Sequence, residues 1–302
     1  ATGRACDAGA CVCVHDCTDG QYQCAGNIRQ RCDADAYGCR RWVDDTDCAG
    51  AGFICSQGEC VCDNQCSSGQ TQCVGNTPQT CASNTSGCWY WSSGTDCNPP
   101  AEFCGNGACH GYTLDSFAGT YATITGGTAL TSSSDDNYYS ITLPFSFLFY
   151  GQPYTQAWVS TNGWLSFGSD PGYFVYANSS PFPVSGAPNQ ALYPYWDDLN
   201  LDSSDCSSTT NLRWETQGIA PNRVVIVQWR DFCSYASSSV RGNMQVRLYE
   251  TTNVIEFLYN RSQWSGSFTA SISIENDTRS LGITVNGFVS GAPSTDYRFT
   301  PY

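Results

Sequence analysis

The spacing of the cysteines in the N-terminal third does most to constrain how this chain can fold. The chain has 20 cysteines, and eight of them recur in the same order 49 positions later, as Cys62 follows Cys13. The first set is Cys13, Cys17, Cys24, Cys32, Cys39, Cys48, Cys55 and Cys60, and the second is Cys62, Cys66, Cys73, Cys81, Cys88, Cys97, Cys104 and Cys109. This register predicts tandem repeats over residues 13–61 and 62–111, preceded in residues 1–12 by the end of a third.

The chemical state of these cysteines can be inferred from their context. Zinc sites usually use CxxC pairs together with histidine, but the chain has no CxxC, and His15 and His110 do not occupy equivalent repeat positions. An even number of cysteines in a Cys-dense chain without lysine is typical of a disulfide framework made in an oxidising compartment. We therefore expect an extracellular protein whose repeats are stabilised mainly by disulfides.

The incomplete first repeat suggests a pairing. Cys6 and Cys11 correspond to Cys55 and Cys60, and they would lack partners if these positions bonded to earlier cysteines. The simplest prediction is local bonds, namely Cys6–Cys11, Cys55–Cys60 and Cys104–Cys109. The six other cysteines of a repeat, such as Cys13 to Cys48, then form three bonds in one of 15 orders. The alternative is that Cys6 or Cys11 bonds to another chain.

The repeat also resembles a known unit. The pattern from Cys17 to Cys32, followed by Trp42 and then Cys48, Cys55 and Cys60, resembles a Cys-rich repeat of secreted and surface proteins of bacteria. Cys13 and Cys39 are additions to its six-cysteine form. The resemblance implies an extracellular spacer or binding module. We expect Trp42 and its counterpart Trp91 to pack against disulfides, and ligand binding is the alternative role for both.

From residue 112 to residue 302 the composition changes, and short segments of alternating apolar and polar residues predict strands. Nine or more strands without a helical stripe predict an all-β fold, an antiparallel β-sandwich similar to a jelly roll. Cys206 and Cys233 are the only cysteines of this domain and are expected to bond to each other. The expected strands are 138–150, 157–167, 191–201, 211–215, 223–232, 244–250, 254–259, 268–275 and 280–285.

Five strings in this domain carry a second resemblance. They are Val159–Phe167, Tyr195–Leu199, Val225–Trp229, Gln245–Glu250 and Ile255–Tyr259. Their order and spacing resemble a module of secreted bacterial proteins that is similar to the nidogen-type extracellular domain. The resemblance implies a β-sandwich with adhesive, matrix or accessory roles and without catalytic residues. It places a tight turn with positive φ at Asn162-Gly163.

Charge and composition exclude several functions. The net charge of −14 lacks the basic surface that nucleic acids or anionic membranes require, and no apolar run reaches the ~18–20 residues that span a bilayer. The two histidines lie in the disulfide-rich region, so the sandwich has no histidine base. Asp197 and Asp198 are adjacent on an expected strand and would point to opposite faces. We therefore expect no enzyme activity.

Two kinds of binding residue stand out. Asp198, Asn200 and Asp202 alternate on one face of an expected strand and could bind Ca²⁺, although a solvated strand face is the interpretation we favour over a bound cofactor. Asp135-Asp136 is a weaker acidic pair. Asn-x-Ser/Thr sequons mark surface positions if the source organism glycosylates asparagine, and they begin at Asn84, Asn178, Asn260 and Asn276.

These features favour a non-enzymatic extracellular structural or adhesive protein. Because the repeats begin within a unit, a surface there is left for a neighbour, and head-to-tail contacts between copies would build a surface fibre or matrix. One alternative is an adhesin or lectin-like module that binds carbohydrate or another ligand with Ca²⁺, through Asp198, Asn200 and Asp202 or through exposed aromatic side chains. Another is an accessory domain of a secreted hydrolase. Expected partners are copies of the chain or glycans, without nucleic acid or membrane insertion.

Overall fold

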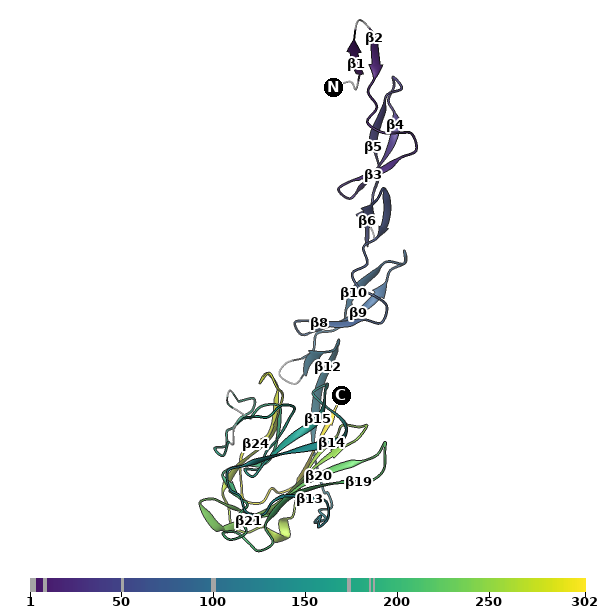
Figure 1. The fold of residues 1–302 in the computed structure, drawn as a ribbon. Helices are drawn as coiled ribbons and strands as arrows, with labels where there is room; N and C mark the ends of the chain where they lie inside the picture. The colour runs from purple at the N-terminus through teal and green to yellow at the C-terminus, as the bar shows by residue number, and fades with distance from the viewer. Residues whose placement is uncertain are drawn as a thin grey trace. The chain divides into compact units, whose positions relative to one another are not determined.

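The computed structural model describes residues 4–7, 10–49, 52–98, 102–172, 175–184, 186 and 188–302. Strands dominate these residues, and a short 3-10 turn lies at Arg261–Gln263 (Figure 1). The chain divides into two compact units, Ala1–Thr95 and Asp96–Tyr302. No helix among the described residues is long and apolar enough to cross a membrane.

The first unit consists of small antiparallel sheets that repeat along the chain. Each of the two full repeats contributes a three-stranded sheet, and a two-stranded hairpin follows the first of these sheets. The equivalent strands lie 49 residues apart, as the cysteine register predicts. The strands are β1 (Arg4–Asp7), β2 (Ala10–Cys13), β3 (Tyr22–Ala25), β4 (Ile28–Ala34), β5 (Arg40–Asp47), β6 (Phe53–Ser56), β7 (Glu59–Cys62), β8 (Thr71–Val74), β9 (Thr77–Ser83) and β10 (Trp89–Ser93).

Disulfides connect the strands of each repeat, and all described cysteines are oxidised. In the first full repeat the bonds are Cys13–Cys39, Cys17–Cys32, Cys24–Cys55 and Cys48–Cys60. Three bonds of the second repeat follow the same order, namely Cys62–Cys88, Cys66–Cys81 and Cys97–Cys109.

These bonds correct the predicted pairing. Cys55 and Cys60 face each other across the β6–β7 hairpin, yet Cys55 bonds to Cys24 and Cys60 bonds to Cys48. The predicted Cys104–Cys109 bond is also wrong, because Cys109 bonds to Cys97. A local disulfide would close a loop of only about five residues. The observed disulfides connect the hairpin to the preceding sheet and close longer loops, which restricts more of the unfolded chain. The predicted Cys6–Cys11 bond lies outside the described side chains.

Cystines take the place of an apolar core in the repeats. Cys39, Cys48 and Cys88 are at most 2% exposed, and the large clusters of buried apolar side chains both lie in the second unit. Trp42 lies opposite Cys32 in the β4–β5 register, and Trp91 lies opposite Cys81 in the equivalent place. Each tryptophan therefore lies across from a disulfide-bonded cysteine, and packing of its ring on the disulfide stays a prediction.

The second unit contains two large antiparallel sheets that form a sandwich (Figure 1). The nine-stranded sheet runs β11 (Glu102–Gly105), β12 (Ala108–Phe117), β25 (Asp296–Pro301), β22 (Ile255–Tyr259), β21 (Ser237–Tyr249), β20 (Val224–Ser234), β19 (Asn211–Gln217) and β13 (Thr128–Thr131), with β18 (Leu199–Asn200) also paired to β20. The six-stranded sheet runs β14 (Tyr138–Phe149), β15 (Gln152–Ser160), β16 (Leu165–Phe167), β17 (Ala191–Trp196), β23 (Thr269–Glu275) and β24 (Gly282–Ser290).

The sandwich core follows from the alternation seen in the sequence. Along β14 every second side chain from Ile141 to Phe149 is buried, and the residues between them are exposed. Side chains from the nine-stranded sheet complete the same cluster, including Val227, Trp229 and Val246. Opposite faces of each strand therefore separate core from surface, as period-2 patterning requires.

The predicted Cys206–Cys233 disulfide is confirmed, and it joins the loop after β18 to the end of β20. The predicted strand 191–201 is interrupted, because the chain bends at Asp197-Asp198 between β17 and β18. A second group of buried aromatics lies outside the main core and includes Trp164, Tyr193 and Trp196. Loop residues between β16 and β17 cover these rings, since Phe182 packs on Tyr193 with ring centroids 4.5 Å apart.

Candidate functional site

Three carboxylates gather at one place on the sandwich, and we call Asp135, Asp136 and Asp198 the acidic cluster. One oxygen of each lies within 4.8 Å of the others. Asp135 and Asp136 belong to the loop between β13 and β14, and Asp198 lies in the bend between β17 and β18. The cluster therefore joins segments that are about sixty residues apart in the sequence.

Asn162, in the turn between β15 and β16, positions the cluster through hydrogen bonds. Its side chain is fully buried, its Nδ2 donates to Asp136 Oδ1 at 2.8 Å, and its Oδ1 accepts from Leu199 N at 3.0 Å. Thr161 Oγ1 donates to the carbonyl oxygen of Asp135 and accepts from Asn137 N at 3.0 Å. One buried turn thus holds both acidic segments together.

The electrostatics of the cluster follow from burial and like charge. The pKa of Asp135 is raised to about 6, mainly by burial and then by the carboxylates of Asp136 and Asp198. The pKa of Asp198 is also raised, first by burial and then by Asp136. Asp135 Oδ1 is inaccessible and has no hydrogen-bond partner. Carboxylate oxygens grouped in this way are of the type that a hard divalent cation uses.

The structure groups Asp198 differently from the sequence prediction. Asn200 Nδ2 donates to Asp205 Oδ2 at 3.2 Å, and Asn200 Oδ1 accepts from Asp202 N at 2.6 Å. Asp202 Oδ1 accepts from Ser204 N at 2.8 Å, and the hydrogen bonds from Ser204 lower the pKa of Asp202. Asn200 and Asp202 therefore shape the turn that leads to Cys206, while Asp198 joins the acidic cluster. The bend at Asp197-Asp198 is the reason, because it ends the strand alternation on which the prediction relied.

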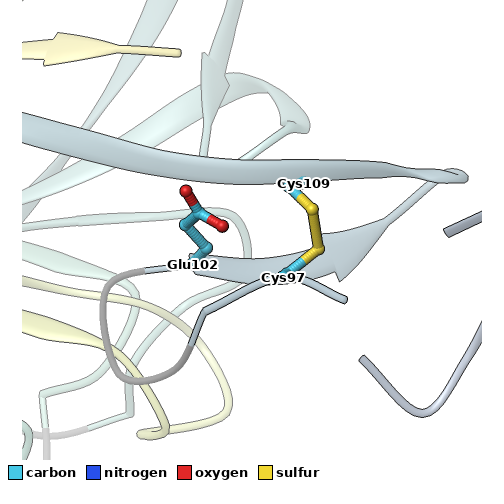
Figure 2. A group of neighbouring side chains, drawn as sticks. All are labelled: Cys97, Glu102 and Cys109. Atoms are coloured by element: carbon cyan, nitrogen blue, oxygen red, sulfur yellow. A yellow bond between two sulfur atoms is a disulfide. The ribbon is translucent and has the colours of Figure 1, made fainter. Parts of the chain in front are cut away.

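Cys97, Glu102 and Cys109 form a second close group of potential ligand atoms. Figure 2 shows the two sulfur atoms joined to each other beside the glutamate. They form the Cys97–Cys109 disulfide, with an S–S distance of 2.06 Å. Glu102 Oε2 accepts from Asn98 N at 2.9 Å. Metal binding by cysteine requires the thiolate, so this group serves as a structural crosslink.

Both histidines are occupied by the backbone. His15 Nδ1 accepts from Arg40 N at 2.9 Å, and His110 Nε2 lies 2.9 Å from the carbonyl oxygen of Gly105. His110 belongs to β12, which continues into the nine-stranded sheet. Each ring thus holds a neighbouring loop or hairpin.

The four sequon asparagines all use their side chains within the fold. Asn84 Oδ1 accepts from Cys88 N at 3.0 Å, Asn178 Nδ2 donates to Thr269 O at 2.8 Å, and Asn260 Nδ2 donates to Gln263 Oε1 at 2.8 Å. Asn276 differs from the expected surface position, because it is 1% exposed and its Nδ2 donates to Thr278 Oγ1 at 2.9 Å. Asn276 is buried because its side chain forms hydrogen bonds within its own turn.

A family model described as NIDO related matches residues 111–298, which is more than half of the chain. The chain belongs to the NIDO-related family. The NIDO-related domain contains the acidic cluster and nearly all of the sandwich, and the Cys-rich repeats precede it. No curated protein matches the chain, and no solved structure does.

The family and the disulfides point to the same environment. A NIDO-related domain suggests an extracellular binding module, and the many disulfides suggest a secreted protein. The expectation of a nidogen-like sandwich is thereby confirmed.

Proposed function

We propose that this protein is a non-enzymatic extracellular structural and adhesive protein, in which the Cys-rich repeats carry a NIDO-related binding domain. The observation that supports this most is the NIDO-related domain in a chain whose described cysteines are all oxidised. Small repeats clamped by disulfides are suited to a spacer, because they need little apolar core to keep their fold.

The arrangement of possible catalytic groups supports a binding role. One ring nitrogen of each histidine is used by a backbone group, His15 Nδ1 by Arg40 N and His110 Nε2 by Gly105 O, which is a structural use of both rings. The described cysteines are in disulfides and offer no thiolate nucleophile.

Adhesion and turnover can be measured on the full oxidised chain. Beads coated with the chain should attach to cells of the source organism, or to their extracellular matrix, more strongly than albumin-coated beads. The same preparation should leave a panel of ester, peptide and glycoside substrates unchanged. Attachment no stronger than that of albumin, or turnover of any of these substrates, would contradict the proposal.

A second candidate function is association between copies, for which exposed apolar side chains on the repeats are the supporting observation. Nine of the fifteen exposed large apolar residues in the described chain lie between Val12 and Tyr90. Tyr37 is 65% exposed, Val12 61% and Val74 57%. Apolar groups gathered in such small units favour protein contacts, so we infer head-to-tail association of copies into a fibre or matrix.

Sedimentation velocity over a hundredfold range of concentration tests this association, with electron microscopy of the same samples. We expect elongated species that grow with concentration and that are reduced in the double variant Tyr37→Ser/Val74→Ser. Ile219→Ser is the matched control, because Ile219 is 82% exposed but lies in the sandwich. A monomer at every concentration would overturn the association and leave the adhesive role open to its own test.

A further inference from the structure

A polar pocket of about 220 Å³ lies at one end of the six-stranded sheet. The end of β16, the start of β17 and the end of β23 meet there, because β17 pairs with both of the other strands. The polar residues that line the pocket are Ser166, Ser169, Asp170, Asn189, Gln190 and Asp277. None of these residues belongs to the acidic cluster.

Ser166 is the most informative residue of this pocket. It is only 3% exposed, and its Oγ has no hydrogen-bond partner. Its neighbours Leu165 and Phe167 are in the sandwich core, so Ser166 points to the outer side of the sheet, where the pocket lies. An unsatisfied buried hydroxyl costs about 1–3 kcal/mol. A ligand that bonds to this hydroxyl would explain why such a group stands here.

Asn189 adds a second unsatisfied group, which can only accept hydrogen bonds. Its Oδ1 is inaccessible and also has no hydrogen-bond partner, and Asn189 lines the same pocket. Ser166 Oγ can donate or accept a hydrogen bond, whereas Asn189 Oδ1 can only accept one. The ligand must therefore offer a hydrogen-bond donor, and it can also offer an acceptor.

The charge of the pocket restricts the ligand further. Asp170 and Asp277 are both exposed, and no arginine lines the pocket. Asp170 Oδ1 accepts from Gly172 N at 2.8 Å, and Asp170 also accepts a hydrogen bond from the Tyr138 hydroxyl. Two carboxylates without a cation repel anions, and they are good acceptors for hydroxyl groups.

An aromatic pair stands beside Asp170. The rings of Tyr138 and Trp158 meet edge to face with centroids 5.6 Å apart, and Trp158 Nε1 donates to Gly168 O at 3.1 Å. Both side chains are partly exposed on the outer side of the sheet. Rings of this kind present a rigid amphipathic surface next to the polar groups.

Backbone hydrogen bonds connect the strand ends around the pocket. Gln190 has a φ of +54°, in the left-handed region that is uncommon for residues other than glycine. Gln190 O accepts from Phe167 N at 2.9 Å, and Gln190 N donates to Asn276 O at 3.2 Å. These hydrogen bonds hold the polar groups in place before a ligand arrives, which lowers the entropic cost of binding.

We propose that this pocket binds one ring of a neutral carbohydrate. Hydroxyls of the sugar donate to the exposed carboxylates of Asp170 and Asp277. Ser166 Oγ and Asn189 Oδ1 are closed to solvent in the structure, and a turn of each side chain brings them to the sugar. The volume is below the ~300–1,000 Å³ of pockets for drug-sized ligands, which suits a single ring. A divalent cation fits less well, because Ca²⁺ takes about 6–8 oxygens and the close acidic groups found in the described chain do not include Asp170 or Asp277. The inference rests on the proposed role as an extracellular binding module, and it names the ligand class.

The test begins with a glycan array that is probed with the labelled full oxidised chain, with and without EDTA. Titration calorimetry then measures the affinity for the monosaccharide that the array identifies. The double variant Asp170→Asn/Asp277→Asn should bind that sugar at least tenfold more weakly. Asp115→Asn is the matched control, because Asp115 is an exposed carboxylate on β12 of the same unit, and it should bind normally.

Ser166→Ala separates a binding role from a structural one. Removal of an unsatisfied hydroxyl should leave the melting temperature unchanged or higher, while the sugar affinity falls severalfold. A lower melting temperature with unchanged affinity would overturn the proposal, and so would an empty array or binding that EDTA abolishes. If the array shows no bound glycan but the beads adhere normally, only the sugar-binding proposal is contradicted. If the beads also fail to adhere, the proposed adhesive function is contradicted as well.

Discussion

At the scale of single residues, Glu275 is an acid held in an apolar setting at the end of β23. Its side chain is fully buried, Oε1 accepts from Val184 N at 2.7 Å, and Oε2 accepts from the Tyr193 hydroxyl at 3.2 Å. Burial raises the pKa of Glu275 to about 7 and outweighs these hydrogen bonds, which lower the pKa. The folded chain therefore favours the protonated acid.

This pKa predicts how stability depends on pH. Because the folded pKa is above the unfolded value of 4.5, the contribution of Glu275 is complete below pH 4.5 and is lost as the pH rises through 7. Glu275→Gln should unfold like the wild type at pH 4.5 and be about 3 kcal/mol more stable at pH 8. Urea titrations at several pH values measure the difference. A difference that does not change with pH would show that ionisation plays no part.

The acidic cluster gives a second prediction at this scale. Asp136→Asn removes the neighbouring charge that contributes most to the raised pKa of Asp135, so that pKa should fall below about 6. Carbon-detected NMR of the carboxyl groups measures it, with Asp115→Asn as the control. Added Ca²⁺ tests the calcium hypothesis on the same sample, since a bound ion would bring the pKa of Asp135 down. A wild-type value near 3.8 without calcium would mean that the carboxylates are not crowded.

The residues of the acidic cluster show how much of the site can be predicted from the sequence. The sequence marks Asp198 as a candidate ligand because it stands in a local alternating pattern, and it marks Asp135-Asp136 only as an acidic pair. Nothing local connects the two segments, because the contact depends on the buried Asn162 turn and on the pairing of distant strands. The unsatisfied Ser166 and Asn189 carry no sequence signal either, since burial and missing partners are properties of the folded chain.

At the scale of elements, the turn between β15 and β16 is a tightly packed joint. Gly163 has a φ of +75°, as the family resemblance predicts, and a Cβ there would overlap the carbonyl oxygen of Tyr195. Gly172 has nearly the same φ of +72°, but a Cβ there would have nothing within 4 Å. A comparison of substitutions at the two glycines therefore distinguishes the cost of backbone strain from the cost of steric overlap.

Alanine at these two glycines should have unequal effects. Gly172→Ala should cost about 1 kcal/mol, because only the left-handed backbone resists the side chain. Gly163→Ala should cost about 3 kcal/mol or more, since the backbone of β17 would also have to move. Guanidinium denaturation of the two variants measures both costs. Equal losses would mean that the joint relaxes easily and that close packing there is unimportant.

Strand prediction succeeded where alternation is continuous and failed where it is short. The segments around β14, β20, β21 and β23 stand out by their period-2 pattern, and the structure has strands there. The four-residue β13 and the terminal β25 were missed, because short or partly polar segments look like loops in isolation. Pairing of β25 between β12 and β22 makes it a strand, and this pairing joins segments far apart in the chain.

At the scale of the whole molecule, the two units keep their folds by different means. The repeats depend on cystines, whereas the sandwich depends on a large apolar core. The repeat register could be predicted because a period is visible in the sequence. The order of the disulfide bonds could not be predicted, because each repeat has the same cysteine positions and therefore allows the same pairings. The partial first repeat favours local bonds, which the full repeats do not form.

Reduction should therefore unfold one unit before the other. In a reducing buffer, hydrogen exchange should become fast over residues 13–95, while β20 and β21 in the sandwich core stay protected. Loss of Cys206–Cys233 should cost the sandwich about 3 kcal/mol, which its core can tolerate. Mass spectrometry of the exchanged peptides gives the answer, with the oxidised chain as control. Repeats that remain protected after complete reduction would contradict a fold held by cystines.

The overlapping bonds of the first full repeat also determine what happens when its backbone is cut. The bonds 13–39, 17–32, 24–55 and 48–60 overlap so that every peptide bond from Cys13 to Cys60 lies inside at least one of them. A protease that nicks the repeat leaves the two pieces covalently attached, and a pull along the chain is still transmitted. Between Cys60 and Cys62 none of these four bonds spans the backbone, so Val61 marks the place where one clean cut separates this repeat from the next.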